Sequence, residues 1–371
     1  MEISKTMKAA RMYEVGGPLQ LDEIETPRPG DHDVLVRVRS CGIVPNLGNV
    51  LANWTNWFPD LPLPPLPAIF GLDPAGEVVE IGEHVRGVSV GQRVYVNPGR
   101  SCGTCKHCNT GDALSCQWYT FNGYFGFSDK SAEIFRKYPY AGLGEYMTAP
   151  AYALVKIPDN VSFDAAARLG YVGTAYSALR KSRAGVTSTV LINGASGTLG
   201  LGGVISALAL GVRKILGTGR DRALLEQVKA LAPDKIEVFS SEDGSIATWA
   251  KQQTYGEGVD AVIDCLGPGA SHETFLDGLY SLRRGGTIVN VGAVSGNVPI
   301  NVHYMMDRNM ALISSLWFST AEGYELAALA ESGSLKLSIF EHHAYPLAEV
   351  NHAISGIAKR NGGFSNFVIH P

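Results

Sequence analysis

The chain of 371 residues has no apolar run long enough to cross a bilayer, and its opening MEISKTMKAARMYEVGG contains no signal-peptide core. It also has no basic excess, since 31 Lys and Arg stand against 35 Asp and Glu, for a net charge of −4. Internal repeats and low-complexity segments are missing as well. These absences argue against a membrane protein and against a nucleic-acid-binding protein, and they predict a cytoplasmic location.

The composition is that of a soluble globular protein, with 45% hydrophobic and 18% charged residues. A chain of 371 residues is long for one domain, so two domains are expected. The 43 glycines suit an α/β protein, which needs many tight turns between its strands and helices.

The stretch from residue 189 to residue 220 has the order strand, glycine-rich turn, helix, strand. In this context a glycine-rich turn binds a dinucleotide, because glycines let the backbone approach the pyrophosphate and the helix N-terminus offers free N–H groups. A tight β–α turn with a purely structural role is the alternative. The residues predicted to hold the pyrophosphate are Ala195, Ser196, Gly197, Thr198, Leu199 and Gly200.

The end of the second strand predicts which nucleotide is bound. Enzymes that use NAD usually place Asp or Glu there, to hold the ribose 2′-hydroxyl, whereas this chain has Thr218-Gly219-Arg220. No carboxylate is present to repel a 2′-phosphate, and a guanidinium can pair with one, so NADP(H) is predicted. The alternative is that Arg220 is simply solvated at the start of a helix that Asp221 caps.

From about residue 186 the chain alternates strand and helix patterns, which predicts a doubly wound parallel sheet with its ligand at the carboxyl ends of the strands. Residues 310 to 318 predict a last apolar strand that could pair between subunits. The residues expected to edge the cofactor at the strand ends are Leu266, Gly267, Val291, Gly292 and Ala293.

The first part and the last part of the chain have strand patterns of their own. Residues 8 to 40 predict β structure, and a helix at 347–360 and a strand at 366–369 close the chain, the strand returning to the first domain. Residues 53 to 68 hold five prolines and two tryptophans, which predicts a loop and a poor helix or strand. Such a loop lines a substrate cleft or packs between lobes.

Four cysteines lie within fifteen residues, spaced C-x2-C-x2-C-x7-C. Four thiolates on one short segment can surround Zn²⁺ as a tetrahedron, and four sulfur ligands leave no position for water or substrate. One structural zinc per chain is therefore predicted, with iron as a weaker option on the same ligands and unconnected or redox-active thiols as the alternative. The ligands are Cys102, Cys105, Cys108 and Cys116.

Nearly the whole chain resembles the zinc-type alcohol dehydrogenases of the medium-chain dehydrogenase/reductase superfamily. The resemblance is carried by PRPGDHDVLVRVRSCGI, GLDPAGEVVEIGEHVRGVSVGQRV, the four-cysteine lobe, the glycine-rich fold and NHAISGIAKRNGGFSNFVIHP. It implies a β-rich GroES-like catalytic domain (1–155 and 310–371, with the zinc lobe at about 98–118), a Rossmann domain (156–309), and assembly into dimers or tetramers.

The ligands that hold the family's catalytic zinc are missing. The first ligand position is Val44, the family's Gly-His-Glu triplet reads Gly71-Leu72-Asp73, and the third position is Gly170 or Tyr171. Apart from a weak tyrosine, none of these side chains ligates a metal. Cys41 stands before the glycine and not after it, so we interpret it as a core thiol.

Three residues are candidates for the catalytic work that zinc would otherwise do. Tyr171, near Thr174, which matches the family's nicotinamide-contacting Thr, is either a general acid or a filler of the vacated volume. Asn46 replaces the Ser or Thr of the family's proton relay and either donates its amide to the substrate oxygen or caps a turn. Asp73 is either a structural acid paired with Arg or backbone, or a general acid with a strongly raised pKa.

Scattered aromatic residues are candidates for the walls of an apolar substrate pocket, although plain packing is the alternative; these are Trp54, Trp57 and Tyr124. Three function classes stay open. The chain is an NADPH-dependent carbonyl reductase or alcohol dehydrogenase for an apolar ketone, aldehyde or alcohol. It is otherwise a reductase of a conjugated C=C or C=N bond, whose conjugation makes a metal dispensable, or a non-catalytic NADPH-binding protein.

Overall fold

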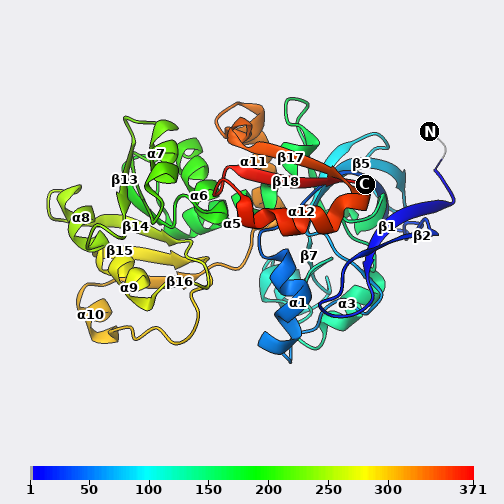
Figure 1. The fold of residues 1–371 in the computed structure, drawn as a ribbon, viewed down its shortest axis with the longest axis horizontal. Helices are drawn as coiled ribbons and strands as arrows, with labels where there is room; N and C mark the ends of the chain where they lie inside the picture. The colour runs from blue at the N-terminus through cyan, green and yellow to red at the C-terminus, as the bar shows by residue number, and fades with distance from the viewer. Residues whose placement is uncertain (1–2) are drawn as a thin grey trace.

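The computed structural model describes residues 3–371. A six-stranded parallel sheet forms the centre of one lobe, in the order β13-β12-β11-β14-β15-β16 (Figure 1). The order reverses between β11 and β14, which places the ligand crevice at the carboxyl ends of these two strands. The strands are β11 (Thr189–Asn193), β12 (Lys214–Gly219), β13 (Ile236–Ser240), β14 (Val259–Asp264), β15 (Leu282–Asn290) and β16 (Ala311–Ser314). The predicted Rossmann architecture is confirmed.

Helices cover both faces of this sheet, and β11 is therefore buried along its whole length. Several of the helices begin at the residue types that cap helices best: the side chains of Asp221, Ser245 and Ser271 each accept a backbone N–H three residues on. The helices are α5 (Leu169–Ser182), α6 (Thr198–Ala209), α7 (Arg222–Ala230), α8 (Ile246–Gln252), α9 (His272–Tyr280) and α10 (Val302–Asp307).

The other lobe is β-rich and is built from both ends of the chain. Its seven-stranded sheet runs β10-β6-β5-β3-β18-β17, with β9 also paired to β3, and β2-β1-β4 form a separate sheet. The C-terminal strand β18 pairs antiparallel with β3, which confirms that the tail returns to the first domain. The strands are β1 (Thr6–Met12), β2 (Gln20–Glu25), β3 (Asp33–Gly42), β4 (Ala68–Ile69), β5 (Asp73–Ile81), β6 (Arg93–Val96), β9 (Tyr146–Pro150), β10 (Leu154–Lys156), β17 (Glu341–Pro346) and β18 (Ser365–His370).

Several shorter elements also belong to this lobe. The small strands β7 (Gly99–Arg100) and β8 (Thr120–Phe121) pair near the cysteine segment, which contains α2 (Lys106–Asn109). Helix α3 (Ser131–Lys137) follows them. The helix expected at 347–360 is present as α12 (Val350–Gly356), with short 3-10 turns on either side.

The prediction of a loop at 53–68 is wrong for its first residues, because α1 (Leu47–Trp57) extends into this range. Its buried residues Leu47, Val50, Leu51 and Trp54 are spaced three or four apart, so they form one helical face. The helical spacing begins before the proline-rich stretch. All five prolines follow the end of the helix, so they do not interrupt it.

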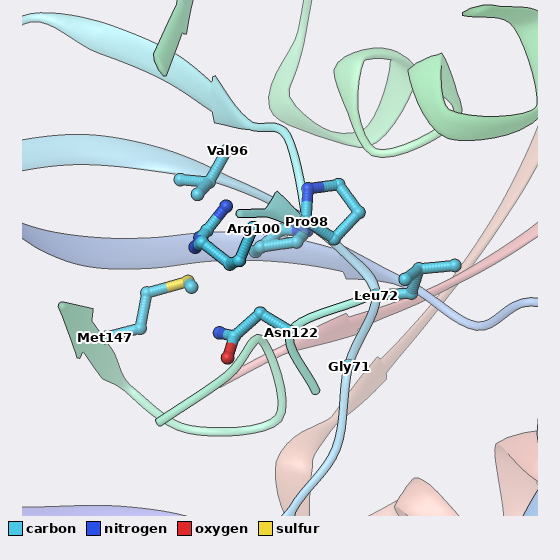
Figure 2. A pocket seen from close by; sticks show the side chains of 8 residues that line it. Gly71, Leu72, Val96, Pro98, Arg100, Asn122 and Met147 are labelled. Atoms are coloured by element: carbon cyan, nitrogen blue, oxygen red, sulfur yellow. The ribbon is translucent and has the colours of Figure 1, made fainter. Parts of the chain in front are cut away.

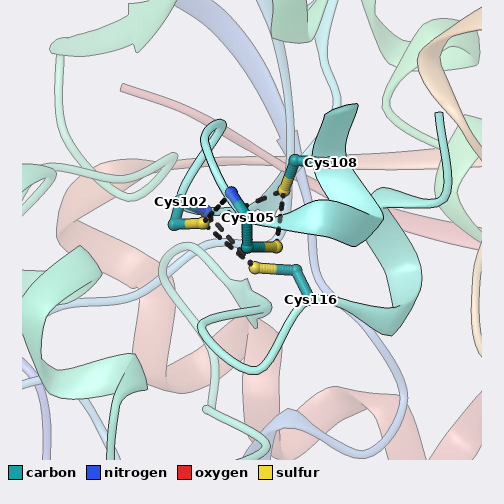
Figure 3. Close-up of side chains that lie close together, drawn as sticks. All are labelled: Cys102, Cys105, Cys108 and Cys116. Atoms are coloured by element: carbon teal, nitrogen blue, oxygen red, sulfur yellow. Dashed lines mark hydrogen bonds between the residues drawn. The ribbon is translucent and has the colours of Figure 1, made fainter. Parts of the chain in front are cut away.

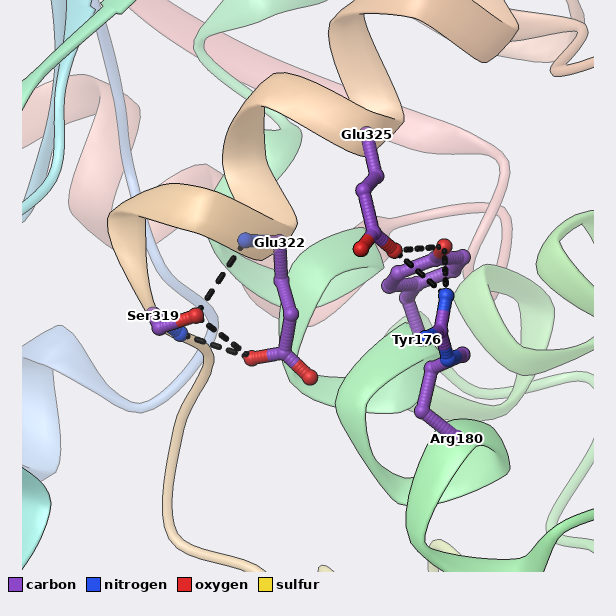
Figure 4. A network of polar contacts seen from close by, with 5 residues as sticks. All are labelled: Tyr176, Arg180, Ser319, Glu322 and Glu325. Atoms are coloured by element: carbon purple, nitrogen blue, oxygen red, sulfur yellow. Dashed lines mark hydrogen bonds and ion pairs between the residues drawn. The ribbon is translucent and has the colours of Figure 1, made fainter. Parts of the chain in front are cut away.

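Helix α11 (Thr320–Glu331) fastens the two lobes together through a polar network with α5 (Figure 4). Arg180 Nη1 donates to Glu325 Oε2 at 2.6 Å, and the hydroxyl of the buried Tyr176 donates to the same oxygen. At the N-terminus of α11, Ser319 and Glu322 form a reciprocal capping box.

The strand predicted at 310–318 is present as β16, which pairs parallel with β15 at the edge of the Rossmann sheet. We therefore propose that the boundary between the lobes lies after β16 and not at residue 309, while the limits at 155 and 156 stay a prediction. In residues 3–371 no helix combines the length and the apolar character needed to span a membrane.

Candidate active site

The glycine-rich turn between β11 and α6 has the tight geometry of a phosphate-binding turn. A Cβ atom at Gly200 would lie 2.1 Å from the carbonyl oxygen of Gly194, so only glycine allows this packing. Gly197 is the N-cap of α6, and the first helical hydrogen bond runs from Leu201 N to Gly197 O. The N–H groups of 198–200 precede that bond and are free to meet an anion.

A second pair of glycines packs against this turn from the C-terminal segment. Gly363 N donates to Ser196 O at 2.8 Å, and a Cβ at Gly363 would lie 2.5 Å from Gly197 O. A Cβ at Gly362 would lie 2.6 Å from Ser196 O. The sequence analysis missed this contact, for which the only signal is the Gly-Gly pair itself. It brings the C-terminal strand of one lobe onto the phosphate turn of the other.

The end of β12 leaves one guanidinium available. Asp221 does cap α7, since its carboxylate accepts Leu224 N at 3.0 Å. Arg222 is engaged in an ion pair with Asp243. The side chain of Arg220 is exposed and has no polar partner among the described residues. The cap therefore exists, and Arg220 remains free to meet a 2′-phosphate.

The five residues expected to edge the cofactor lie together at the carboxyl ends of β14 and β15. Ala293 N donates to Leu266 O at 2.8 Å. A Cβ at Gly292 would lie 2.4 Å from Leu266 O, so the two strand ends touch through backbone. Gly267 and Val291 flank this contact in sequence.

Asp73 lies at the start of β5, packed against the first turn of α5. A Cβ at Gly170 would lie 2.0 Å from Asp73 Oδ1, so glycine at this position leaves room for the carboxyl. Asp73 is 1% exposed and accepts a hydrogen bond from Tyr95 Oη at 2.7 Å. Burial raises the pKa of Asp73 to about 7, against the opposing effects of the Tyr95 hydrogen bond and the charge of Arg168.

Arg168 is a site residue that the sequence analysis missed. Its guanidinium is 3% exposed, donates from Nη2 to Gly363 O at 2.9 Å and to Ser365 O at 3.1 Å, and lies 5.8 Å from the ring centre of Tyr171. Burial lowers the pKa of Arg168 to about 10, so it stays charged at neutral pH. A lone arginine within the apolar run Ala165 to Leu169 was the available signal.

Tyr171, Tyr124 and Asp73 are close enough to influence one another electrostatically, and Asn46 adjoins Tyr124. Burial and the charge of Asp73 raise the pKa of Tyr171, and the charge of Arg168 partly offsets this. Burial, followed by the charges of Tyr171 and Asp73, raises the pKa of Tyr124, while a hydrogen bond from the Asn46 side chain opposes it. Both phenols are therefore neutral donors at physiological pH.

Asn46 occupies the N-cap position of α1, but its side chain makes no capping hydrogen bond. Its Oδ1 accepts from Asn49 Nδ2 at 3.0 Å, which turns its own amide N–H groups toward Tyr124. Thr174 lies one turn after Gly170 on α5 and donates from Oγ1 to Gly170 O at 2.8 Å. Its oxygen can still accept a hydrogen bond.

An aromatic row leads away from this cluster. Phe125 packs against Tyr124 with ring centres 4.6 Å apart and stacks on Trp54 at 3.8 Å. Trp54 is itself 4.6 Å from Phe58 at the end of α1. Trp57, which was predicted to join the wall, is 48% exposed and makes none of these ring contacts.

Leu72, Val96, Arg100 and Met147 surround a small packed space that has no room for a water molecule (Figure 2). Arg100 is fully buried there and donates from Nη1 to the backbone oxygens of Asn97 and Gly99. Leu72 and Val44 are both buried among apolar neighbours. These two positions, where the resemblance predicts ligands of a catalytic zinc, are therefore part of the hydrophobic core.

The four predicted zinc ligands converge on one point (Figure 3), with all Sγ atoms within 4.8 Å of one another. The Sγ–Sγ distances are 3.6 Å for Cys105–Cys108 and for Cys102–Cys116, and 4.0 Å for Cys102–Cys108. A tetrahedron with metal–sulfur bonds of about 2.3 Å has edges of about 3.8 Å. The four thiols therefore fit a closed structural zinc site, and residues 3–371 contain no other such group of three or more His, Cys, Asp or Glu.

Elemental analysis of the purified protein should find about one zinc and no stoichiometric iron per chain, as expected for one closed four-sulfur site. Cys108→Ser should lose this zinc, because the site then lacks a thiolate. Cys265→Ser is the matched control, since Cys265 lies outside the lobe, and it should keep the zinc. Equal zinc in both variants would contradict the assignment.

Comparison with known proteins gives two family matches. The model described as "Alcohol dehydrogenase GroES-like domain" matches residues 30–159. The model described as "Zinc-binding dehydrogenase" matches residues 198–332. The first match covers the β-rich lobe from β3 to β10, and the second runs from α6 to α11.

Curated relatives and solved structures match over nearly the full length. An alcohol dehydrogenase of Geobacillus stearothermophilus is 30% identical over 356 residues, covering 95% of this chain and 96% of that protein. A quinone oxidoreductase of Homo sapiens is 28% identical over 379 residues, covering 98% of each. The structure of a thermostable alcohol dehydrogenase from Pyrobaculum aerophilum has a TM-score of 0.79 at 26% identity and covers 99% of this chain and 100% of that one.

Proposed function

The chain belongs to the zinc-type alcohol dehydrogenase family of the medium-chain dehydrogenase/reductase superfamily, and from this premise we propose that it reduces apolar ketones or aldehydes with NADPH and without a catalytic zinc. The relatives that it matches are oxidoreductases, and they support the same general activity for this chain. The observation that carries the finer proposal is that neutral hydrogen-bond donors gather beside a vacated ligand set. Tyr171, Tyr124 and Asn46 lie together where Val44, Leu72 and Gly170 offer no ligand.

The glycine turn, the strand ends and Thr174 are the residues that would hold the cofactor, which when bound supplies the hydride. The free N–H groups at the start of α6 would hold the pyrophosphate, and Arg220 would hold the 2′-phosphate. The contact of Gly363 with Ser196 holds the two lobes together at this turn.

Tyr171 donates a hydrogen bond and then its proton to the substrate oxygen as negative charge develops there. Arg168, 5.8 Å from the ring centre, stabilises the phenolate that remains. Asn46 donates an amide N–H to the same oxygen. Asp73 accepts the Tyr95 hydrogen bond, and its charge acts on Arg168 without a direct contact, so it serves as a structural acid in this mechanism.

A second function is favoured by a specific observation. Gly71-Leu72-Asp73-Pro74 is similar to the zinc-free quinone reductases, and a relative at 28% identity is named quinone oxidoreductase. Reduction of a conjugated C=C or C=N bond would need less stabilisation of a localised alkoxide. The aromatic row of Trp54, Phe125 and Tyr124 suits the apolar substrate of either reaction.

We also propose a homodimer or homotetramer in the cytoplasm. In residues 3–371 no strand pairs with the outer edge of β16, and Leu312 on this strand is 40% exposed. Leu316 is 43% exposed and Met306 66% exposed nearby in sequence. A second copy pairing at this edge would cover these apolar side chains.

Incubation with NADPH and two paired substrates, a saturated ketone and the matching enone, tests the reaction. We expect the ketone to give its alcohol and the enone to give the allylic alcohol, separated by chromatography. Consumption of the enone alone, with the saturated ketone as product, would establish the second function. If neither saturated ketones nor enones are turned over in a broad panel, the protein would be a non-catalytic NADPH-binding protein.

Replacing Tyr171 by Phe tests the proton donor. Turnover should fall by about 10²-fold or more, because the transition state loses its acid, while the Kd for NADPH stays within about twofold. Tyr176→Phe is the matched control on the same helix, because its hydroxyl bonds Glu325, and it should keep full turnover. A Tyr171→Phe enzyme of normal rate would mean that this tyrosine only fills space.

The double change Gly219→Asp with Arg220→Asp tests the choice of nucleotide. NADPH affinity should fall by about 10- to 100-fold relative to NADH, because a charge-assisted pair is replaced by repulsion. A Cβ at Gly219 would lie 2.9 Å from Ser196 Oγ, which can rotate, and 3.3 Å from Leu225 Cδ2, so the new side chain requires a small adjustment of these two side chains. Arg222→Ala, whose guanidinium pairs with Asp243, is the control and should leave the ratio unchanged. An unchanged ratio in the double variant would refute the 2′-phosphate assignment.

A further inference from the structure

Three buried polar side chains form a ladder across the carboxyl ends of β12, β11 and β14. Thr218 Oγ1 donates to Asn193 Oδ1 at 2.8 Å, and Asn193 Nδ2 donates to Asp264 Oδ1 at 3.0 Å. Thr218 and Asn193 are 1% exposed and Asp264 is 0% exposed. Because Thr218 occupies the oxygen of the Asn193 amide, it is the neutral NH₂ group that faces Asp264.

Asp264 has no counterion in this ladder. Its second oxygen, Oδ2, is buried and has no hydrogen-bond partner among the described residues. The groups that act on it are the Asn193 amide, the backbone N–H of Leu266 and the adjacent thiol of Cys265, and none of them is a cation. On the α9 side the neighbour is the Thr274 carbonyl, which accepts from the same Asn193 amide. Burial raises the pKa of Asp264 to about 7, more than the Asn193 and Leu266 hydrogen bonds lower it.

The ladder lies directly behind the turn that would hold the cofactor phosphates. Asn193 is the last residue of β11, and the turn begins at Gly194. Cys265 N donates to Asn193 O at 2.9 Å, and a Cβ at Gly194 would lie 3.3 Å from Cys265 O. An anion seated on this turn therefore approaches a buried carboxyl that nothing neutralises.

We propose that Asp264 takes up a proton when NADPH binds, so that its carboxyl is neutral in the complex. The inference rests on the proposed cofactor. Like charges in a poorly screened interior disfavour the ionised carboxyl, so the phosphates shift its equilibrium toward the protonated form. The proton comes from solvent and returns to solvent when the cofactor leaves, and no covalent bond changes.

Calorimetric titration of NADPH into the whole protein at pH 7, in buffers of different ionisation enthalpy, counts these protons. Wild type should take up about half a proton per chain more than Asp264→Asn, since a carboxyl with a pKa of about 7 is half ionised at that pH. The cofactor's own 2′-phosphate contributes equally to both proteins. Equal uptake in wild type and Asp264→Asn would overturn the proposal.

The pH dependence of the Kd, followed by NADPH fluorescence, separates this role from a structural one. Between pH 6 and pH 9 the Kd of wild type should rise several-fold relative to that of Asp264→Asn. At higher pH the carboxyl is ionised in the free protein, and the free energy of protonating it then opposes NADPH binding. Above pH 8 the Asn variant should therefore bind more tightly than wild type. A residue that only supports the fold predicts weaker binding of the variant at every pH, and that result would count against the proposal.

Titration of wild type with NADH covers the case in which Asp264→Asn does not fold. NADH has no 2′-phosphate, so proton uptake at pH 7 then reports on the protein, and an uptake of zero would overturn the inference. If neither nucleotide binds, the proposed cofactor fails together with the inference. If either binds without any proton difference, only the inference fails.

Discussion

Arg168 joins the two lobes at the point where the candidate site forms. Its Nη2 holds the carbonyls of Gly363 and Ser365, and Gly363 in turn holds the phosphate turn through Ser196. The charge of the same guanidinium acts on Asp73 and Tyr171. A buried cation of this kind is stable only while its carbonyl partners stay in place. One side chain therefore contacts the segment that leads into the C-terminal strand and also acts on the charges of the candidate site.

The two lobes each bring a buried carboxyl to their junction, and the surroundings give them different roles. Asp73 has a hydrogen bond from Tyr95 and a cation, Arg168, within electrostatic range. Asp264 has a hydrogen bond from Asn193 and no cation. Burial raises the pKa of both to about 7, but a fixed positive charge ties the first to its place. Asp264 has no such charge beside it, and we propose that its protonation state changes when an anion binds to the turn at 194–200.

Features that depend on neighbours in sequence could be predicted, and features that depend on distant segments could not. The geometry of the glycine turn at 194–200 and that of the cysteines at 102–116 each follow from a short sequence spacing. In the structure the glycines form one tight turn, and the four cysteines form a separate cluster. The helix α1 was missed because prolines after residue 58 hid an apolar face that begins at Leu47. Arg168 and the glycines at 362–363 were missed because their partners lie up to 197 positions away.

The proposed reduction without a catalytic zinc sets an energetic requirement that the proposed donors must meet. A catalytic metal stabilises a developing alkoxide by several kcal/mol, whereas one neutral hydrogen bond contributes about 1 kcal/mol in water-exposed surroundings. Donors such as Tyr171 and Asn46 approach the larger value only where water is excluded and the donors are already oriented. The aromatic row from Tyr124 to Trp54 supplies an apolar wall, and the Asn49 hydrogen bond orients the Asn46 amide. Under this proposal, exclusion of water and fixed donors become the conditions for reduction at this site.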